Sequence, residues 1–228
     1  MITSVHEFYP NITIIIADDS EVPEALVYPN VFHYIMPFAT GWFAGRNLVL
    51  SQVRTKYFVW IDDDFIFTNT TRLELMLEKL ENPFLGLDVV SGIVDTGKSK
   101  VYLDKTYNKI HVRSHSKNGY CLKRRSGEYA LEGLPRCKLA DEVINFFMAK
   151  TLSARNIGFD PHLARFGHHE FFWDGLGKLR VASCDDVSAF HARAAYTKHG
   201  NYRYQFLWDV AFQKWMMYSV YKNNLQMF

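Results

Sequence analysis

A short apolar run over residues 57–61 ends in three consecutive aspartates, Asp62, Asp63 and Asp64. Such a run is typical of a buried strand, so the acidic residues are expected at the end of a strand. Side chains alternate along a strand, which predicts Asp62 and Asp64 on one side and Asp63 on the other. Paired carboxylates favour a hard divalent cation, Mn²⁺ or Mg²⁺, that bridges to substrate phosphates. The alternative is that they only end the strand, although three adjacent carboxylates repel one another without a cation.

The same pattern occurs earlier, where the β-branched run 11–17 precedes Asp18 and Asp19. An acidic residue at such a strand end accepts hydrogen bonds from a base or a ribose in nucleotide-binding folds. A plain turn or helix cap is an equally compatible interpretation. Asp18 and Asp19 are therefore candidates for binding a nucleotide.

Strand and helix patterns alternate along the first half of the chain. Strands are predicted at 11–17, 31–36, 57–61 and 87–94, and helices at 42–53 and 71–81, the latter beginning with a capping box at Thr71 and Glu74. This alternation predicts an α/β fold with a doubly wound, mostly parallel sheet flanked by helices. Ligands bind outside the carboxyl ends of the strands in such sheets, where both acidic clusters fall.

The second half gives weaker signals. Residues 95–136 are polar and suggest either an inserted antiparallel excursion or a mobile loop. Residues 138–155 have a helical pattern, with Asp141 as the expected N-cap. Two short strands are predicted at 180–183 and 187–191.

Two single residues add to the candidate site. Arg46 lies near the start of the helix predicted at 42–53, and its planar guanidinium suits a diphosphate, although a routine surface ion pair is equally compatible. His191 ends the last predicted strand and is a candidate metal ligand through a neutral imidazole nitrogen. A lone histidine is more often structural, so this role depends on what lies beside it.

A later stretch carries the candidate base. If it is helical, Glu170 and Asp174 lie four residues apart on one face, and a carboxylate beside an acceptor hydroxyl can act as a general base. Phe172 and Trp173 offer ring faces on which a sugar could stack. The alternative is an amphipathic helix with solvated acids.

Composition excludes several classes of protein. The net charge of +2 gives no basic stripe for nucleic acid, and no apolar stretch approaches the ~20 residues that span a bilayer. Sequons at Asn11 and Asn69 permit glycosylation in a secretory compartment. In an oxidising compartment we favour a Cys137–Cys184 pair with Cys121 left over, although the sequence leaves the pairing open.

Taken together, these stretches resemble inverting glycosyltransferases of the GT-A fold, which is Rossmann-like. More narrowly, the chain is similar to the β-1,4-N-acetylgalactosaminyltransferases that build ganglioside and related glycans. The stretches that carry the resemblance are Ile15 to Ser20, Met36-Pro37-Phe38, Gly41 to Asn47, Thr55 to Phe65, Asp141 with Asn145-Phe146-Phe147, Gly158 to Pro161, Glu170 to Gly177, and Cys184 with Asp186-Val187 and His191.

The resemblance implies a UDP-sugar donor, UDP-N-acetylgalactosamine, and Mn²⁺. It implies Asp64 and His191 on the metal, Asp62 on the ribose or the metal, and Asp19 near the uridine. Glu170 becomes the first choice of base, with Asp174 second. The expected reaction is one in-line displacement, with inversion, by a hydroxyl of a glycolipid or glycoprotein glycan.

The resemblance also implies an organisation and a location. We expect one catalytic domain over residues 1–228, with a nucleotide-sugar-binding half at 1–94 and an acceptor-binding half at 95–228. The family's fold normally begins with a strand and a full helix ahead of Ile12, so the sheet is expected to lack its first strand. Family members are usually membrane-anchored in the Golgi, which predicts the Golgi lumen for this domain.

Other functions stay open on the sequence. The donor could instead be UDP-GlcNAc or UDP-glucose, and a truncated domain could bind a sugar or nucleotide without transferring it. A hydrolase acting through Glu170 and Asp174 is a more distant alternative, because it leaves Asp62 and Asp64 without a role.

Overall fold

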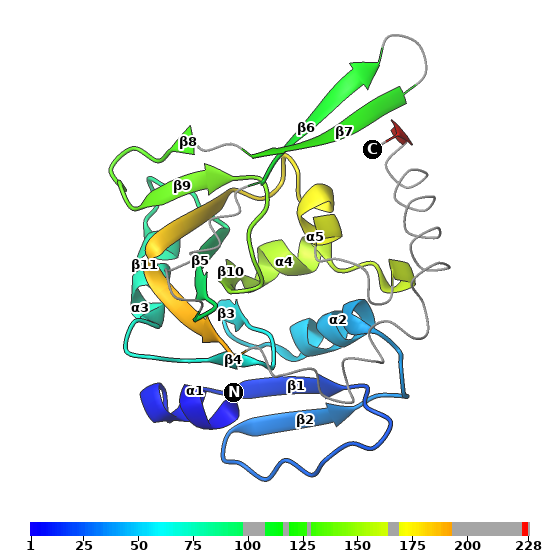
Figure 1. The fold of residues 1–228 in the computed structure, drawn as a ribbon, viewed down its shortest axis with the longest axis vertical. Coiled ribbons are helices and arrows are strands. Elements are labelled where there is room, and N and C mark those ends of the chain that lie inside the picture. The colour runs from blue at the N-terminus through cyan, green and yellow to red at the C-terminus, as the bar shows by residue number, and fades with distance from the viewer. Residues whose placement is uncertain (98–107, 116–118, 127–128, 164–168, 193–224, 228) are drawn as a thin grey trace.

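The computed structural model describes residues 1–97, 108–115, 119–126, 129–163, 169–192 and 225–227 (Figure 1). The elements of the first part are α1 (Ile2–Phe8), β1 (Ile14–Asp18), β2 (Val31–Ile35), α2 (Trp42–Gln52), β3 (Tyr57–Trp60), β4 (Phe65–Ile66), α3 (Leu73–Glu81) and β5 (Val89–Asp95). Those of the second part are β6 (Asn108–His115), β7 (Gly119–Ser126), β8 (Tyr129–Ala130), β9 (Cys137–Ala140), β10 (Phe147–Lys150), α4 (Thr151–Ile157), the 3-10 helix η1 (Pro161–Leu163), α5 (His169–Asp174), β11 (Val181–His191) and β12 (Leu225–Met227).

The main sheet has the strand order β3-β10-β5-β11-β9-β8, with β4 paired to β11. The α/β class predicted from the sequence is confirmed. The pairing is mixed rather than mostly parallel, because β5 and β11 run parallel while β10 is antiparallel to both of its neighbours. Strands from before and after residue 95 alternate in this one sheet, so the two halves of the chain share a single core.

Two smaller sheets accompany the main one. The polar region 95–136 contains the antiparallel pair β6 and β7, which β12 joins, so the predicted antiparallel excursion is confirmed there. At the opposite end, β1 pairs in parallel with β2. Neither strand pairs with the main sheet in the described part of the chain, and a cleft separates β1 from β3. In the described part of the chain, β3 is therefore an edge strand of the main sheet.

Helices cover both faces of the main sheet (Figure 1). Because strand side chains alternate, β5 sends Val90 and Val94 to one face and Val89 to the other. The first face packs against α3 through residues such as Met76. The second face packs against α2, α4 and α5, with Phe171 in its core. None of the described helices is long and apolar enough to cross a membrane.

The prediction of a helix at 138–155 is wrong. The segment instead contains β9, an irregular stretch, β10 and only then α4 from Thr151. Tertiary contacts override the helical pattern, because β10 inserts between β3 and β5 and buries Phe147 and Ala149. Asp141 is consequently not a helix cap.

The capping box predicted at the start of α3 is also wrong. The N-cap position is Arg72, and the Thr71 hydroxyl donates to the carbonyl of Ser188. The phenol oxygen of Tyr9 takes over the capping role by accepting from the backbone N–H of Leu73 at 2.8 Å. A residue from the first turns of the chain therefore anchors a helix more than sixty positions later.

The two late strands predicted from the sequence are one strand, β11, with an irregularity between Ser183 and Ser188. The Cys137–Cys184 disulfide joins β9 to β11, as the favoured pairing predicted. The side chain of Cys121, the predicted leftover thiol, lies outside the described residues.

Candidate functional site

The site is built around the cleft between β1 and β3, which has a volume of about 2200 Å³. Its walls include the carboxyl ends of both strands and the first turns of α2. The predicted site residues that line it are Asp18, Asp19, Arg46, Asp62, Asp63, Asp64 and His191. The fold thus gathers seven candidates from four segments of the chain in one cavity, as the strand-end rule predicts.

Asp64 and His191 are in direct contact. The His191 Nε2 atom lies 2.7 Å from an Asp64 carboxylate oxygen, although 127 positions separate the two residues. Backbone pairing between β4 and the end of β11 holds them there, and the imidazole packs edge-on against Phe65. A carboxylate oxygen and an imidazole nitrogen on one wall of a cleft are a donor set that suits Mn²⁺.

Asp62 is held by two protein groups. One carboxylate oxygen lies 3.8 Å from the Arg46 guanidinium, and the other accepts from the Asn145 side-chain amide at 3.0 Å. Desolvation raises the pKa of the Asp62 carboxyl, and Arg46 and Asn145 oppose that shift by stabilising the charge. Both oxygens face protein partners, so Asp62 is less available than Asp64 as a metal ligand.

The three aspartates lie in a turn between β3 and β4 rather than at alternating strand positions. The Phe65 N–H donates to the Asp62 carbonyl across this turn. Asp63 is exposed, whereas Asp62 and Asp64 are half-buried. The predicted separation of Asp63 from its neighbours is therefore seen, but a turn produces it instead of strand alternation.

Arg46 is buried among aromatic rings. Its guanidinium carbon lies 4.5 Å from the centre of the Trp60 ring and 5.5 Å from that of Phe159. Burial lowers the pKa of Arg46 to about 10, and the charge of Asp62 opposes the shift. The side chain stays cationic at neutral pH. It contacts aromatic rings and Asp62, so the alternative of a routine surface ion pair does not apply.

Asp18 and Asp19 take different partners. Asp18 accepts from the Ser20 backbone N–H at 2.9 Å and contacts the His33 ring at 3.0 Å. Desolvation would raise the pKa of Asp18, but these hydrogen bonds outweigh it and lower the pKa. Asp19 accepts from the backbone N–H of Gly41, just before α2. Both carboxylates thus also fix the backbone around the cleft.

The candidates on α5 lie outside the cleft lining. Glu170 is 1% exposed, and its carboxylate accepts from the backbone N–H of Asp160 at 3.4 Å, whereas Asp174 is half-exposed. Phe172 is buried in the core, edge-on to Phe147, so its ring is not available for stacking on a sugar. The apolar face of α5 explains this correction, because it packs on the sheet.

Trp173 is 9% exposed and stacks on the ring of His169. That histidine pairs in turn with the buried Glu142. Neither His169 nor Glu142 was singled out from the sequence. Glu142 lies in the segment predicted as a helix, and in the segment of His169 only Glu170, Asp174 and the two rings were given roles.

Asn145 is the site residue that sequence reasoning left without a role. It contacts Asp62, yet its Oδ1 atom and the indole Nε1 of Trp60 hydrogen-bond to no other described residue. Both residues line the cleft, so these buried polar atoms can pair with a ligand. Asn145 belongs to a stretch that carries the family resemblance, but the resemblance gave it no role and the local pattern predicted a helix there.

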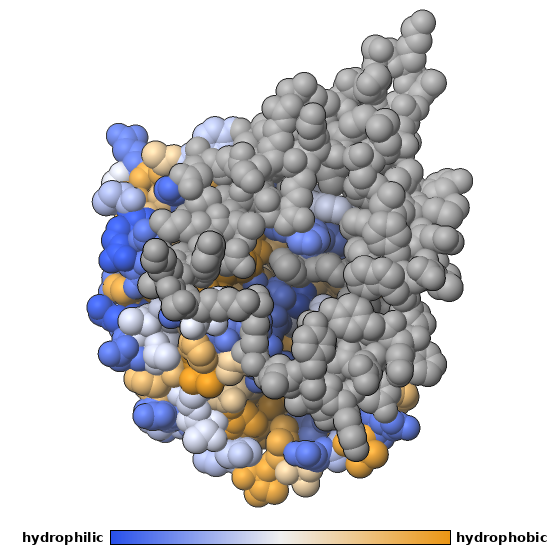
Figure 2. All heavy atoms as spheres, in the orientation of Figure 1, coloured by the Kyte–Doolittle hydropathy of each residue, from blue (hydrophilic) through white to orange (hydrophobic). Residues whose placement is uncertain are grey.

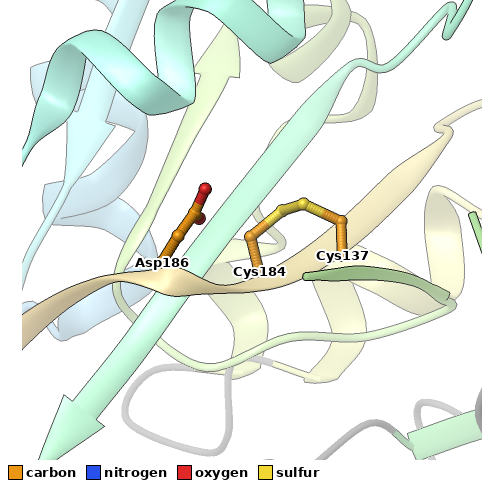
Figure 3. A group of neighbouring side chains, drawn as sticks. All are labelled: Cys137, Cys184 and Asp186. Atoms are coloured by element: carbon orange, nitrogen blue, oxygen red, sulfur yellow. A yellow bond between two sulfur atoms is a disulfide. The ribbon is translucent and has the colours of Figure 1, made fainter. Parts of the chain in front are cut away.

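A second group of metal-binding residue types lies away from the cleft, at Cys137, Cys184 and Asp186 (Figure 3). The two sulfur atoms are bonded to each other and therefore supply no thiolate. Asp186 accepts instead from the Lys79 ammonium at 2.7 Å. This group is structural.

A mixed α/β fold with acidic residues at the strand ends of one large cleft is the arrangement of a nucleotide-binding α/β domain. The chain belongs to glycosyl transferase family 2, whose family model matches residues 1–150. This finding agrees with the resemblance noted in the sequence.

Two curated relatives illustrate the similarity. The β-1,4 N-acetylgalactosaminyltransferase 1 of Homo sapiens is 49% identical over 195 residues, covering 84% of this chain and 36% of that protein. The β-1,4 N-acetylgalactosaminyltransferase 2 of Mus musculus is 46% identical over 192 residues, with the same coverages. The chain therefore spans about a third of the length of the curated relatives it matches.

Solved structures support the fold. A crystal structure of GalNAc-T7 with UDP, GalNAc and Mn²⁺ superposes with a TM-score of 0.57 at 12% identity, covering 84% of this chain and 40% of that one. The structure of S. aureus TarS 1-349 in complex with UDP gives a TM-score of 0.50 at 12% identity, covering 83% and 53%. The GT-A fold is confirmed by these matches.

Proposed function

We propose that this domain transfers N-acetylgalactosamine from UDP-N-acetylgalactosamine to a hydroxyl of an acceptor glycan, with inversion and with a divalent cation. The observation that carries the proposal is the Asp64–His191 contact in the cleft beside Asp62 and Arg46. The names of the curated relatives support this donor sugar over UDP-GlcNAc or UDP-glucose.

Asp64 and His191 would hold the cation, Mn²⁺ or Mg²⁺. They fit it because an oxygen and a nitrogen ligand meet on one wall and leave room in a large cleft for the diphosphate oxygens. A bound cation supplies positive charge next to the leaving diphosphate. Asp62, held by Arg46 and Asn145, would contact the ribose.

The remaining cleft residues would bind the nucleotide. Asp19 and Asp18 would lie near the uridine, and the exposed Asp63 would lie at the rim. Arg46 would act mainly through Asp62, because its guanidinium is enclosed by rings, instead of binding the diphosphate directly. Its charge still makes the cleft more favourable for a phosphate group.

For the base we keep Glu170 as first choice and Asp174 as second. The Glu170 carboxylate is held in place by the hydrogen bond that it accepts from the Asp160 backbone N–H, whereas the Asp174 carboxylate is the more exposed of the two. Either would remove the proton of the acceptor hydroxyl as that oxygen attacks the anomeric carbon. Trp173 remains the candidate ring for the acceptor, which would be a glycolipid or glycoprotein glycan.

The first 94 residues would serve mainly the donor and the rest mainly the acceptor, with His191 as the donor-site ligand from the second part. The Golgi lumen, as part of a longer membrane-anchored protein, is our proposed location. The buried disulfide supports an oxidising compartment, and both sequon asparagines, Asn11 and Asn69, are exposed.

The test is calorimetric titration of UDP into the protein with Mn²⁺, with excess chelator, and with the variants Asp64→Ala and His191→Gln. We expect binding with Mn²⁺ and at least tenfold weaker binding with chelator or in either variant, because the cation joins the diphosphate to these side chains. Glu78→Ala, which removes an exposed carboxylate on α3, should bind as the parent does.

Turnover assays with UDP-N-acetylgalactosamine, UDP-GlcNAc and UDP-glucose on glycolipid and glycoprotein acceptors then identify the sugar. Metal-independent binding would contradict the proposed cation site. Tight metal-dependent binding without transfer to any acceptor would point to a nucleotide-binding module instead of an enzyme.

A further inference from the structure

Two sequence stretches of the candidate site have no role in the proposed function as described so far. Asn47 follows Arg46 on α2, and the turn from Gly158 to Asp160 lies more than 110 positions later. The structure brings them together, because the Asn47 side chain hydrogen-bonds to the backbone of Phe159.

Asn47 makes two hydrogen bonds to one backbone unit. Its Nδ2 donates to the carbonyl of Phe159 at 2.5 Å, and its Oδ1 accepts from the N–H of Phe159 at 2.9 Å. A side-chain amide that satisfies both backbone groups of one residue fixes that residue in position and orientation. Gly158 leads into this point with a φ of 69°, a conformation that glycine adopts freely.

Phe159 then connects the two ends of the site. On the donor side, its ring lies 5.5 Å from the Arg46 guanidinium carbon and 5.6 Å from the centre of the Trp60 ring. On the other side, it stacks on Phe171 of α5, with ring centres 4.7 Å apart and planes 19° apart.

A second link runs through the next residue. The backbone N–H of Asp160 donates to the carboxylate of Glu170, so the segment that Asn47 holds also contacts the candidate base. If the Phe159 backbone moved, α5 would therefore move with it, because the Phe159 ring stacks on Phe171 and the Asp160 N–H bonds to Glu170.

We infer that Asn47 is a positioning residue, which fixes α5 and its carboxylates, Glu170 and Asp174, relative to the donor site at the start of α2. The inference rests on the proposed function. Reacting groups must be held at a defined distance and orientation, and a misplacement of about 1 Å can lower the rate about a hundredfold. Asn47 itself is not among the residues that line the cleft.

The test compares Asn47→Ala and Asn47→Asp with Leu80→Ala. Leu80→Ala opens a cavity at α3, in the hydrophobic cluster that does not contain Phe159 and outside the cleft lining, so it is a control for loss of stability. The measurements are the amide hydrogen exchange of Phe159 and Asp160, UDP affinity with Mn²⁺, and kcat at saturating donor.

Asn47→Ala is expected to speed exchange at Phe159 at least tenfold, to leave UDP affinity within about twofold, and to lower kcat about ten- to a hundredfold. Asn47→Asp keeps the acceptor for the Phe159 N–H but turns a carboxylate oxygen toward the Phe159 carbonyl, which repels it, so its kcat should fall at least as far as that of Asn47→Ala. Leu80→Ala should keep its kcat at temperatures where it is folded.

Equal losses of kcat in Asn47→Ala and Leu80→Ala would overturn the inference, because they would indicate loss of stability alone. Unchanged exchange at Phe159 in Asn47→Ala would also overturn it. If the parent protein binds no UDP and transfers no sugar, the proposed function has failed, and the exchange data alone then decide whether Asn47 holds this segment.

Discussion

At the cleft, three acidic side chains are fixed by partners from other segments of the chain. Asp64 meets His191, Asp62 meets Asn145, and Asp18 meets His33. A charge in a partly desolvated cleft is costly unless hydrogen bonds or opposite charge stabilise it. These partners therefore hold the acidic side chains in position when no ligand is bound.

Asp18 gives a pH-dependent prediction at this scale. Its pKa is lowered in the folded protein, so the stability it adds is present above its unfolded pKa and is lost as pH falls through the lowered value. Asp18→Asn should lose about 1–2 kcal/mol of unfolding free energy at pH 7. Urea unfolding of both proteins checks this, and the difference should shrink below about pH 3. A difference independent of pH would contradict the role of the charge.

The secondary-structure elements owe their shape to close packing as well as to local preference. In the middle of β5, a Cβ atom added to Gly92 would lie 2.5 Å from the Phe146 ring and 2.7 Å from the Val187 carbonyl oxygen. The Val187 carbonyl oxygen belongs to the backbone and cannot move aside as the end of a flexible side chain can. The absence of a side chain at this position allows β11 to follow β5 through its irregular segment.

Gly92→Ala is accordingly expected to lower the unfolding free energy by about 1–3 kcal/mol through overpacking. Gly45→Ala, the same change in α2, is the matched control, because the nearest atoms to its added Cβ lie at 3.4 and 3.6 Å. That variant should be neutral or more stable by up to about 1 kcal/mol. Equal effects of the two changes on urea unfolding would contradict the packing explanation.

The whole molecule has a well-buried main sheet and a more open end at β1 and β2. Hydrophobic surface gathers at that end in Figure 2, where Phe32 and Ile35 of β2 are exposed. All five residues of β1 are only half-buried, although four of them are apolar. The candidate site therefore lies at the boundary between the most and the least buried parts of the fold.

The disulfide stabilises the buried part. Cys137 and Cys184 are 47 positions apart, and closing a loop of that length in the unfolded chain corresponds to about 4 kcal/mol. Replacing both by alanine should lower the unfolding free energy by about 2–4 kcal/mol, measured by urea unfolding. Reduction of the parent protein should give a similar loss, and an unchanged midpoint after verified reduction would contradict the prediction.

The sequence by itself determined the four longer strands β1, β2, β3 and β5, the helices α2 and α3, the acidic strand ends and the family resemblance. These depend on local patterns, since an apolar run followed by aspartates has the same meaning wherever the chain goes next. His191 and Cys184 were also predictable, through the resemblance and the count of cysteines.

Only the tertiary structure decided the rest. Residues 138–155 have a helical pattern, but only the part from Thr151 is helical; β10 pairs between β3 and β5, where its side chains are better buried than on a surface helix. Phe172 has a ring suited to sugar but lies in the core. The partners of Asp62, of Arg46 and of Asn47 come from remote segments, and no local pattern encodes which remote segment a side chain will meet.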